Sequence, residues 1–234
     1  FAVFAAAIAS VLLGAFPLLT AAMLAVGAVV LTETITPAQA YSGSANSSVL
    51  LVVIAFIVAQ AVVKSGLGRR ISLFMVSRFG GSSLGLAYSV VLTDAAIAPA
   101  FPSNTARGGV LYPIVLSVAK GAGSKPEDPE GRRLGGYLMF CSMAGLAVSS
   151  ALWMTATSCN PIAVQIVQQA GLEISFGKWF LASAVPSLIA ILLLPLIVAK
   201  LFPPRVGKTP EAAAAARKEL ARMGGMSRQE WITA

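Results

Sequence analysis

A polar triplet, Ser103-Asn104-Thr105, interrupts an apolar part of the chain and is followed closely by Arg107. Prolines stand at positions 99 and 102, just before it. Hydroxyl and amide side chains in such a place can cap a new helix, whose first backbone N–H groups carry a partial positive charge. These groups together can bind an anion without several cationic side chains. The alternative is a capped loop between two helices.

A second polar stretch, Thr155 to Pro161, interrupts another apolar run. Pro161 opposes continuation of a helix, so we expect a broken helix here. Secondary transporters bind substrate where two broken helices meet in the middle of the membrane. The alternative is a kinked helix whose hydroxyls bond to its own preceding turn. The candidate substrate ligands from both stretches are Ser103, Asn104, Thr105, Arg107, Thr157, Ser158 and Asn160.

Arg107 has three alternative roles. A cation at membrane depth must be paired or hydrated. It could grip a substrate carboxylate in a bidentate fork, pair with Asp94, or be solvated in a cavity. Asp94 lies nine residues before Ser103, about 13 Å away along a helix, so a direct pair needs a long reach. Gly108 and Gly109 are expected to allow close packing of the helices.

The composition predicts an all-α integral membrane protein. Of 234 residues, 57% are apolar and 11% are charged, whereas soluble domains carry about a quarter charged residues. The net charge of +8 comes mostly from short links between apolar runs, so it indicates membrane orientation and not nucleic-acid binding. There is no histidine, and Cys141 and Cys159 lack metal or disulfide spacing. These absences argue against a metal site and against an intramembrane protease.

The apolar runs and basic links predict six segments. Basic links at 64–80 and 120–133 are expected in the cytoplasm, so the region between them must begin and end on that side. Each arm of this region is expected to cross only half of the bilayer. The segments are scaffold transmembrane helices 1–66, an interfacial amphipathic helix 67–81, a re-entrant helical hairpin 82–120, a broken transmembrane helix 134–170, a transmembrane helix 179–201 and a cytoplasmic linker 202–234.

Both ends of the chain indicate a longer protein. The sequence begins inside an apolar run, and Ser227 followed by Glu230 is a capping box that starts a new helix. Within the linker, Thr209 is expected to cap a helix that ends at Gly224. We therefore expect a second half after this one.

The sequence SNTARGGVLYPI, preceded by VLTDAAIAPAFP, resembles the hairpin of the divalent-anion:sodium symporter (DASS) family. The segments VVKSGLGRRIS, SALWMTATSCNPIA and LFPPRVGKTPEAAAAARKELARMGGMSRQEW resemble its 2-oxoglutarate/malate translocator and citrate/succinate antiporter branch. The resemblance covers nearly the whole chain. It implies that this chain is the first of two inverted repeats in a transporter that works as a homodimer.

The resemblance also implies roles for the polar residues. Ser103, Asn104 and Thr105 would contact a substrate carboxylate, and the 157–160 stretch would face them. In sodium-coupled members Ser103 and Asn104 would also bind the ion, with Cys159 as a further candidate. Sodium-coupled members of the family carry a hydroxyl residue four positions before the motif serine, where this chain has Pro99. The lost oxygen favours transport without sodium.

We therefore predict a secondary transporter that exchanges C4/C5 dicarboxylates or citrate by alternating access, not an enzyme. A sodium-coupled dicarboxylate symporter and, more distantly, a channel subunit with a re-entrant pore loop are the alternatives. The expected partners are small di- or tricarboxylate anions, membrane lipid and a second copy of the chain. No cofactor is expected unless sodium serves as coupling ion, and the expected location is the bacterial inner membrane.

Overall fold

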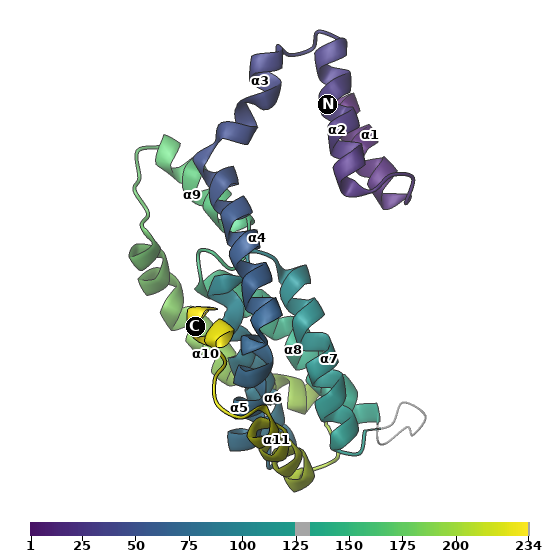
Figure 1. The fold of residues 1–234 in the computed structure, drawn as a ribbon, viewed down its shortest axis with the longest axis vertical. Coiled ribbons are helices and arrows are strands. Elements are labelled where there is room, and N and C mark those ends of the chain that lie inside the picture. The colour runs from purple at the N-terminus through teal and green to yellow at the C-terminus, as the bar shows by residue number, and fades with distance from the viewer. Residues whose placement is uncertain (125–131, 234) are drawn as a thin grey trace. The chain divides into compact units, whose positions relative to one another are not determined.

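The computed structural model describes residues 1–124 and 132–233, and every named element in these ranges is a helix (Figure 1). The prediction of an all-α protein is confirmed. The chain divides into two compact units, residues 1–51 and 52–234, which are described separately.

The first unit is a small, largely exposed group of apolar helices. Helices α1 (Ala2–Leu12) and α2 (Leu18–Leu31) pack along each other, followed by α3 (Pro37–Ser42) and the short 3-10 helix η1 (Gly43–Ala45). Of the residues in α1 and α2 only Ala21 is buried. Apolar helices with so little internal burial are typical of contact with lipid or with other protein.

The second unit begins in α4 (Ser47–Ser65), which meets α5 (Leu67–Phe79) at a bend of 60°. Gly66 forms this corner with a φ of +81°, a conformation that glycine adopts without steric cost. Helix α5 packs against α6 (Ser83–Ile97) and against α11 (Pro210–Met223) from the linker. The amphipathic segment predicted at 67–81 is therefore a separate helix, and its place at the membrane surface stays a prediction.

The predicted hairpin consists of α6, the 3-10 turn η2 (Ala98–Ala100) and α7 (Asn104–Gly121). By length and composition, segments Ser83–Ala100, Arg133–Leu152 and Phe176–Leu201 could each cross a membrane. The first arm of the hairpin is thus longer than our half-bilayer argument assumed, because η2 extends the apolar run. The re-entrant path therefore rests on the charge pattern alone and stays a prediction.

Helix α8 (Arg132–Leu152) packs against both arms of the hairpin and against α10 (Phe176–Leu201). Leu134, Tyr137, Leu138 and Cys141 on α8 are completely buried. The Tyr137 hydroxyl donates to the carbonyl of Pro195 (2.9 Å), which fixes α8 to the proline-containing turn of α10. After α8 the chain breaks and resumes as α9 (Cys159–Gln169).

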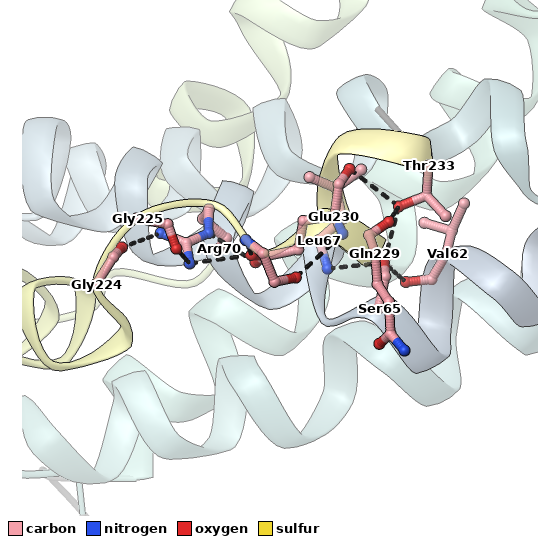
Figure 2. A network of polar contacts seen from close by, with 10 residues as sticks. Val62, Ser65, Leu67, Arg70, Gly224, Gly225, Gln229, Glu230 and Thr233 are labelled. Atoms are coloured by element: carbon pink, nitrogen blue, oxygen red, sulfur yellow. Dashed lines mark hydrogen bonds and ion pairs between the residues drawn. The ribbon is translucent and has the colours of Figure 1, made fainter.

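The linker folds back onto the corner between α4 and α5 (Figure 2). As predicted, Gly224 ends α11 and the Ser227–Glu230 capping box starts α12 (Arg228–Thr233). Arg70 donates to Glu230 and, across 2.9 and 3.1 Å, to the carbonyls of Gly224 and Gly225. The Thr209 hydroxyl does not cap α11 as predicted, because it donates to the carbonyl of Gly80 (2.9 Å). The linker is thereby fixed at both ends of α11.

Candidate functional site

The polar triplet lies at the turn between the two arms of the hairpin. Ser103 is the N-cap of α7, and its Oγ accepts a hydrogen bond from the N–H of Ala106 (3.3 Å). The helix begins at Asn104, directly after this cap. Asn104 and Thr105 are exposed, whereas Phe101 beneath the turn is buried. The triplet therefore presents the first turn of a helix, with its free N–H groups, at an accessible surface.

The end of α8 is held by side chains from two other helices. A helix that stops inside an apolar environment leaves carbonyl groups that need donors. Four carbonyls around this end accept hydrogen bonds from side chains. Nδ2 of Asn160 on α9 donates to the carbonyls of Ser150 (2.7 Å) and Trp153 (3.1 Å). From α10, Nε1 of Trp179 donates to the carbonyl of Ala151 (3.0 Å), and Oγ of Ser183 donates to that of Leu152 (2.9 Å). The break after α8 is thus an ordered, hydrogen-bonded helix end and not a frayed one.

The two helix breaks are joined directly by hydrogen bonds. The N–H of Ser158 donates to the carbonyl of Pro102 (3.0 Å), and Oγ1 of Thr155 donates to the carbonyl of Pro99 (2.8 Å). The indole N–H of Trp153 donates to the carbonyl of Ala95 on α6 (2.9 Å). The loop between α8 and α9 therefore supplies the donors that the hairpin turn lacks.

Arg107 is completely buried, although it follows the exposed tip residues Asn104 and Thr105 by less than one helical turn. Its Nη2 lies 2.7 Å from Oδ1 of Asn104, 2.6 Å from Oγ of Ser150 and 3.0 Å from the carbonyl of Leu146. Its Nη1 donates to Oγ of Ser149 (3.0 Å). The guanidinium therefore connects α7 to α8 instead of facing an external ligand.

Asp94 on α6 is the acidic partner of Arg107. The carboxylate is completely buried, with Oδ1 at 3.7 Å from Nε of Arg107. Ser149 lies between the two groups, donating to Oδ2 of Asp94 while it accepts from Arg107. Oδ1 of Asp94 and Nε of Arg107 make no hydrogen bonds within the described ranges. Of the three roles that the sequence left open for Arg107, the structure shows the ion pair with Asp94.

The bond from the N–H of Ser158 to the carbonyl of Pro102 brings two stretches of predicted ligands side by side, residues 103–105 and residues 157–158. Two others are engaged elsewhere, Arg107 in the buried pair and Asn160 at the end of α8. Cys159 is an exposed free thiol at the start of α9.

Two expectations from the sequence differ from the structure. Pro161 does not end a helix, because it lies in the first turn of α9, where its missing N–H is not needed. Gly109 has no neighbour that a side chain would meet, and Gly108 has only an ordinary contact with Leu146. Close helix packing therefore does not explain this glycine pair.

Sequence reasoning missed Ser149 and Ser150. They lie in an apolar run beside no motif, and only their pairing as adjacent hydroxyls in a membrane segment could have drawn attention to them. Both face Arg107 from α8 and are buried. They complete the contact between α8 and the hairpin.

A separate cleft of about 690 Å³ lies between α4, α5, α7 and α11. Its walls are mainly apolar, and Arg69 and Glu219, paired at 2.8 Å, stand at its edge. None of the polar tip residues lines it. The cleft and the hairpin tip are therefore distinct features.

The sequence is similar to proteins described as transporters. It is 36% identical to "Putative malate transporter YflS" of Bacillus subtilis (strain 168), over 98% of this chain and 48% of that protein. It is 40% identical to "Dicarboxylate transporter 2.1, chloroplastic" of Arabidopsis thaliana, over 90% and 38%. It is 38% identical to the "Citrate/succinate antiporter" of Escherichia coli (strain K12), over 81% and 39%.

The chain spans about half the length, or less, of these relatives. The family described as "Sodium:sulfate symporter transmembrane region" matches residues 1–234. With its apolar helices and broken helix pair, the chain is a multi-pass membrane protein that belongs to this sodium:sulfate symporter family.

Proposed function

We propose that the full-length protein exchanges C4/C5 dicarboxylates or citrate across a membrane by alternating access. One observation carries the proposal. The hairpin turn and the break between α8 and α9 are hydrogen-bonded to each other. Their hydroxyl and amide donors are accessible, whereas the guanidinium of Arg107 is buried. Such a site suits an anion that must be released as readily as it is bound.

The anion ligands in this proposal are uncharged groups at the tip. Oδ1 of Asn104 already accepts from Arg107, so the Nδ2 donors of Asn104 remain for the anion. The hydroxyls of Ser103, Thr105, Thr157 and Ser158 and the free N–H groups of the first turn of α7 complete the set. Arg107 and Asn160 then act as positioning residues, because each is committed to a neighbouring helix.

The moving body in this proposal is residues 82–201. It includes α10, because α10 packs closely against α8 and accepts hydrogen bonds from the hydroxyls of Tyr88 and Tyr137. Helix α5, beyond the Gly66 corner, is the arm that carries it, and residues 1–66 form the scaffold. Elements joined by several buried hydrogen bonds are expected to move as one.

The substrate class rests on the names of the relatives, which mention malate, dicarboxylates, citrate and succinate. Sodium-coupled symport, with an ion at Ser103, Asn104 and Cys159, is the alternative, because the family description names sodium. Pro99 favours exchange, since it offers no side-chain oxygen to an ion.

We also propose a homodimer in the bacterial cytoplasmic membrane. Apolar side chains such as Leu181, Leu192 and Ile197 on α10 are largely exposed in the isolated chain. We expect lipid, the second repeat and a second copy to cover these faces. In this proposal the α5 corner and the linker lie on the cytoplasmic side, because the links around them are basic.

The test is counterflow by the full-length protein in liposomes loaded with unlabelled malate. We expect uptake of labelled dicarboxylate that requires internal dicarboxylate and is unchanged when sodium is replaced by choline. Uptake into empty liposomes driven by a sodium gradient would support the symporter instead. Flux that does not saturate would support a channel.

A further inference from the structure

The cleft between α4, α5, α7 and α11 has room for an elongated ligand. Its volume of about 690 Å³ lies within the range of about 300–1,000 Å³ that is typical of ligand pockets. Along α7 its wall extends from Val110 to Gly121, which is about 16 Å at the rise of a helix. The hydrocarbon layer of one bilayer leaflet is about 15 Å thick, half of the hydrocarbon core. The cleft therefore matches the acyl chain of a membrane lipid in length.

Small residues keep the walls of this cleft open. They include three alanines of α11 and the glycines Gly66 and Gly121. A Cβ added to either glycine would meet open space. Among the described residues, the only polar side chains on the walls are Arg69, Ser117 and Glu219. Water finds few hydrogen-bond partners in such a place, so an apolar occupant is favoured.

One end of the cleft has an excess of positive charge. Glu219 is shared by two arginines, with its carboxylate 2.8 Å from Arg69 and 3.8 Å from Arg222. The arginine side chains are 60% and 82% exposed, so N–H groups remain open to a further anion. Lys64, exposed on the last turn of α4, follows Val63, which lines the cleft. Three cations against one carboxylate leave a net charge of +2 at this end.

We propose that the cleft binds an anionic phospholipid, with an acyl chain between the four helices and the phosphate at Lys64, Arg69 and Arg222. Burial of the chain and attraction of the headgroup to these cations both favour binding. A protein segment in the same place would have to supply carboxylates for the cations or bury them unpaired, at a large cost. The lipid lies between α4 of the scaffold and α7 of the hairpin, away from the polar tip residues.

Photocrosslinking of the purified full-length protein tests this site. The protein is placed in phosphatidylcholine nanodiscs that contain a small fraction of phosphatidylglycerol with a diazirine on its acyl chain. After illumination, peptide mass spectrometry should locate the crosslinks on the cleft walls, in segments 62–76, 110–121 and 212–219. Phosphatidylcholine with the same diazirine has no net charge and should give about fivefold less product there, because each cation near a headgroup adds roughly that preference.

One variant tests the walls. Ala215→Phe places a ring in the cleft from α11 and should lower crosslinking of the walls several-fold. Ala214→Phe, at the neighbouring exposed position outside the cleft, is the matched control and should leave the yield unchanged.

A second variant tests the cations without changing the walls. Lys64→Gln combined with Arg222→Gln should remove most of the preference for phosphatidylglycerol over phosphatidylcholine. Lys178→Gln combined with Lys200→Gln loses the same charge at exposed positions of α10 and should keep that preference.

Three outcomes would overturn the proposal. Crosslinks confined to other segments would mean that another part of the full-length protein covers the cleft. Equal yields from the two lipids at the walls would rule out recognition of an anionic headgroup. An unchanged yield in a folded Ala215→Phe variant would place the acyl chain elsewhere, and the charge variant stays decisive if this protein does not fold. None of these measurements involves a dicarboxylate, so they do not depend on the proposed function.

Discussion

Nε of Arg70 lies 2.6 Å from Oε1 of Glu230, although 160 positions separate the two residues along the chain. The pair connects α5, directly after the Gly66 corner, to the last helix of the linker. Glu230 also accepts from the N–H of Ser227, and both interactions favour the charged form of the carboxyl group. The position of the linker is therefore coupled to the conformation of the α4–α5 corner.

Acid should weaken this contact within a definite range of pH. The hydrogen bond from Arg70 and that from Ser227 lower the pKa of Glu230 from 4.5 to about 2. Since the folded pKa is lower than the unfolded one, the stabilisation is complete above about pH 4.5 and is lost as the pH falls toward 2. Glu230→Gln should lower the melting temperature at neutral pH.

The measurement is a melting curve of the full-length protein and of this variant from neutral pH down to the lowest pH at which both stay soluble. The difference between them should be constant at neutral pH and should shrink once the pH is below about 4.5. A difference that does not change with pH would mean that the variant loses packing and not charge.

Asn104→Asp should impair anion binding selectively. The substitution keeps Oδ1 for Arg107 but replaces the outward NH₂ donor with a negatively charged oxygen. We expect KM for the dicarboxylate to rise by about tenfold or more, because a donor is lost and like charges repel. Counterflow at several substrate concentrations measures this. Gln168→Glu, exposed on α9, is the matched control and should leave KM unchanged.

Asn160→Ala should reduce stability more than substrate affinity. Its side chain bonds to the carbonyls of Ser150 and Trp153, and no other side chain is placed to replace both bonds among the residues described. Each carbonyl left without a donor costs about 1–3 kcal/mol. We expect a lower melting temperature with a KM that changes less than in Asn104→Asp. A large rise in KM at unchanged stability would instead make Asn160 a direct ligand.

The two cysteines should react very differently with a maleimide. Cys159 is exposed at the first position of α9, beside the tip, whereas Cys141 is completely buried on α8. Labelling should therefore modify Cys159, and malate should slow it by occupying the adjacent site. Mass spectrometry locates the label, and Cys159→Ser should remove it. Labelling at the same rate with and without malate would place the anion elsewhere.

Gly85→Ala and Gly109→Ala should have opposite outcomes. A Cβ on Gly85 would lie 1.9 Å from the carbonyl oxygen of Phe79, so the start of α6 would have to move away from the end of α5. A Cβ on Gly109 meets nothing. We expect little folded protein from the first variant and a normal melting temperature from the second, measured by size-exclusion chromatography and thermal denaturation.

Much of the helix pattern could be predicted from local signals. Hydropathy marked the apolar runs, and short-range chemistry marked their ends, as with Ser103 before α7 and the Ser227–Glu230 box before α12. These signals act over about four residues, so they can be read from the sequence alone.

The contacts that complete the site act over longer distances and could not be predicted. Trp179 reaches a carbonyl 28 positions away and Ser183 one 31 positions away, because α10 packs beside the end of α8. Helical rise alone makes a pair between Asp94 and Arg107 difficult, yet the length of the arginine side chain and the serine between the two groups make it possible. Helix periodicity contains no information on either contact.

The bond from the N–H of Ser158 to the carbonyl of Pro102 joins backbone to backbone. Any residue except proline at position 158 can form it, and any residue at all can accept it at position 102. This link between the two helix breaks thus does not depend on the side chains at positions 102 and 158. Hydroxyl and amide side chains around the proposed anion site can therefore be substituted one at a time while this backbone link between the two helix breaks is kept.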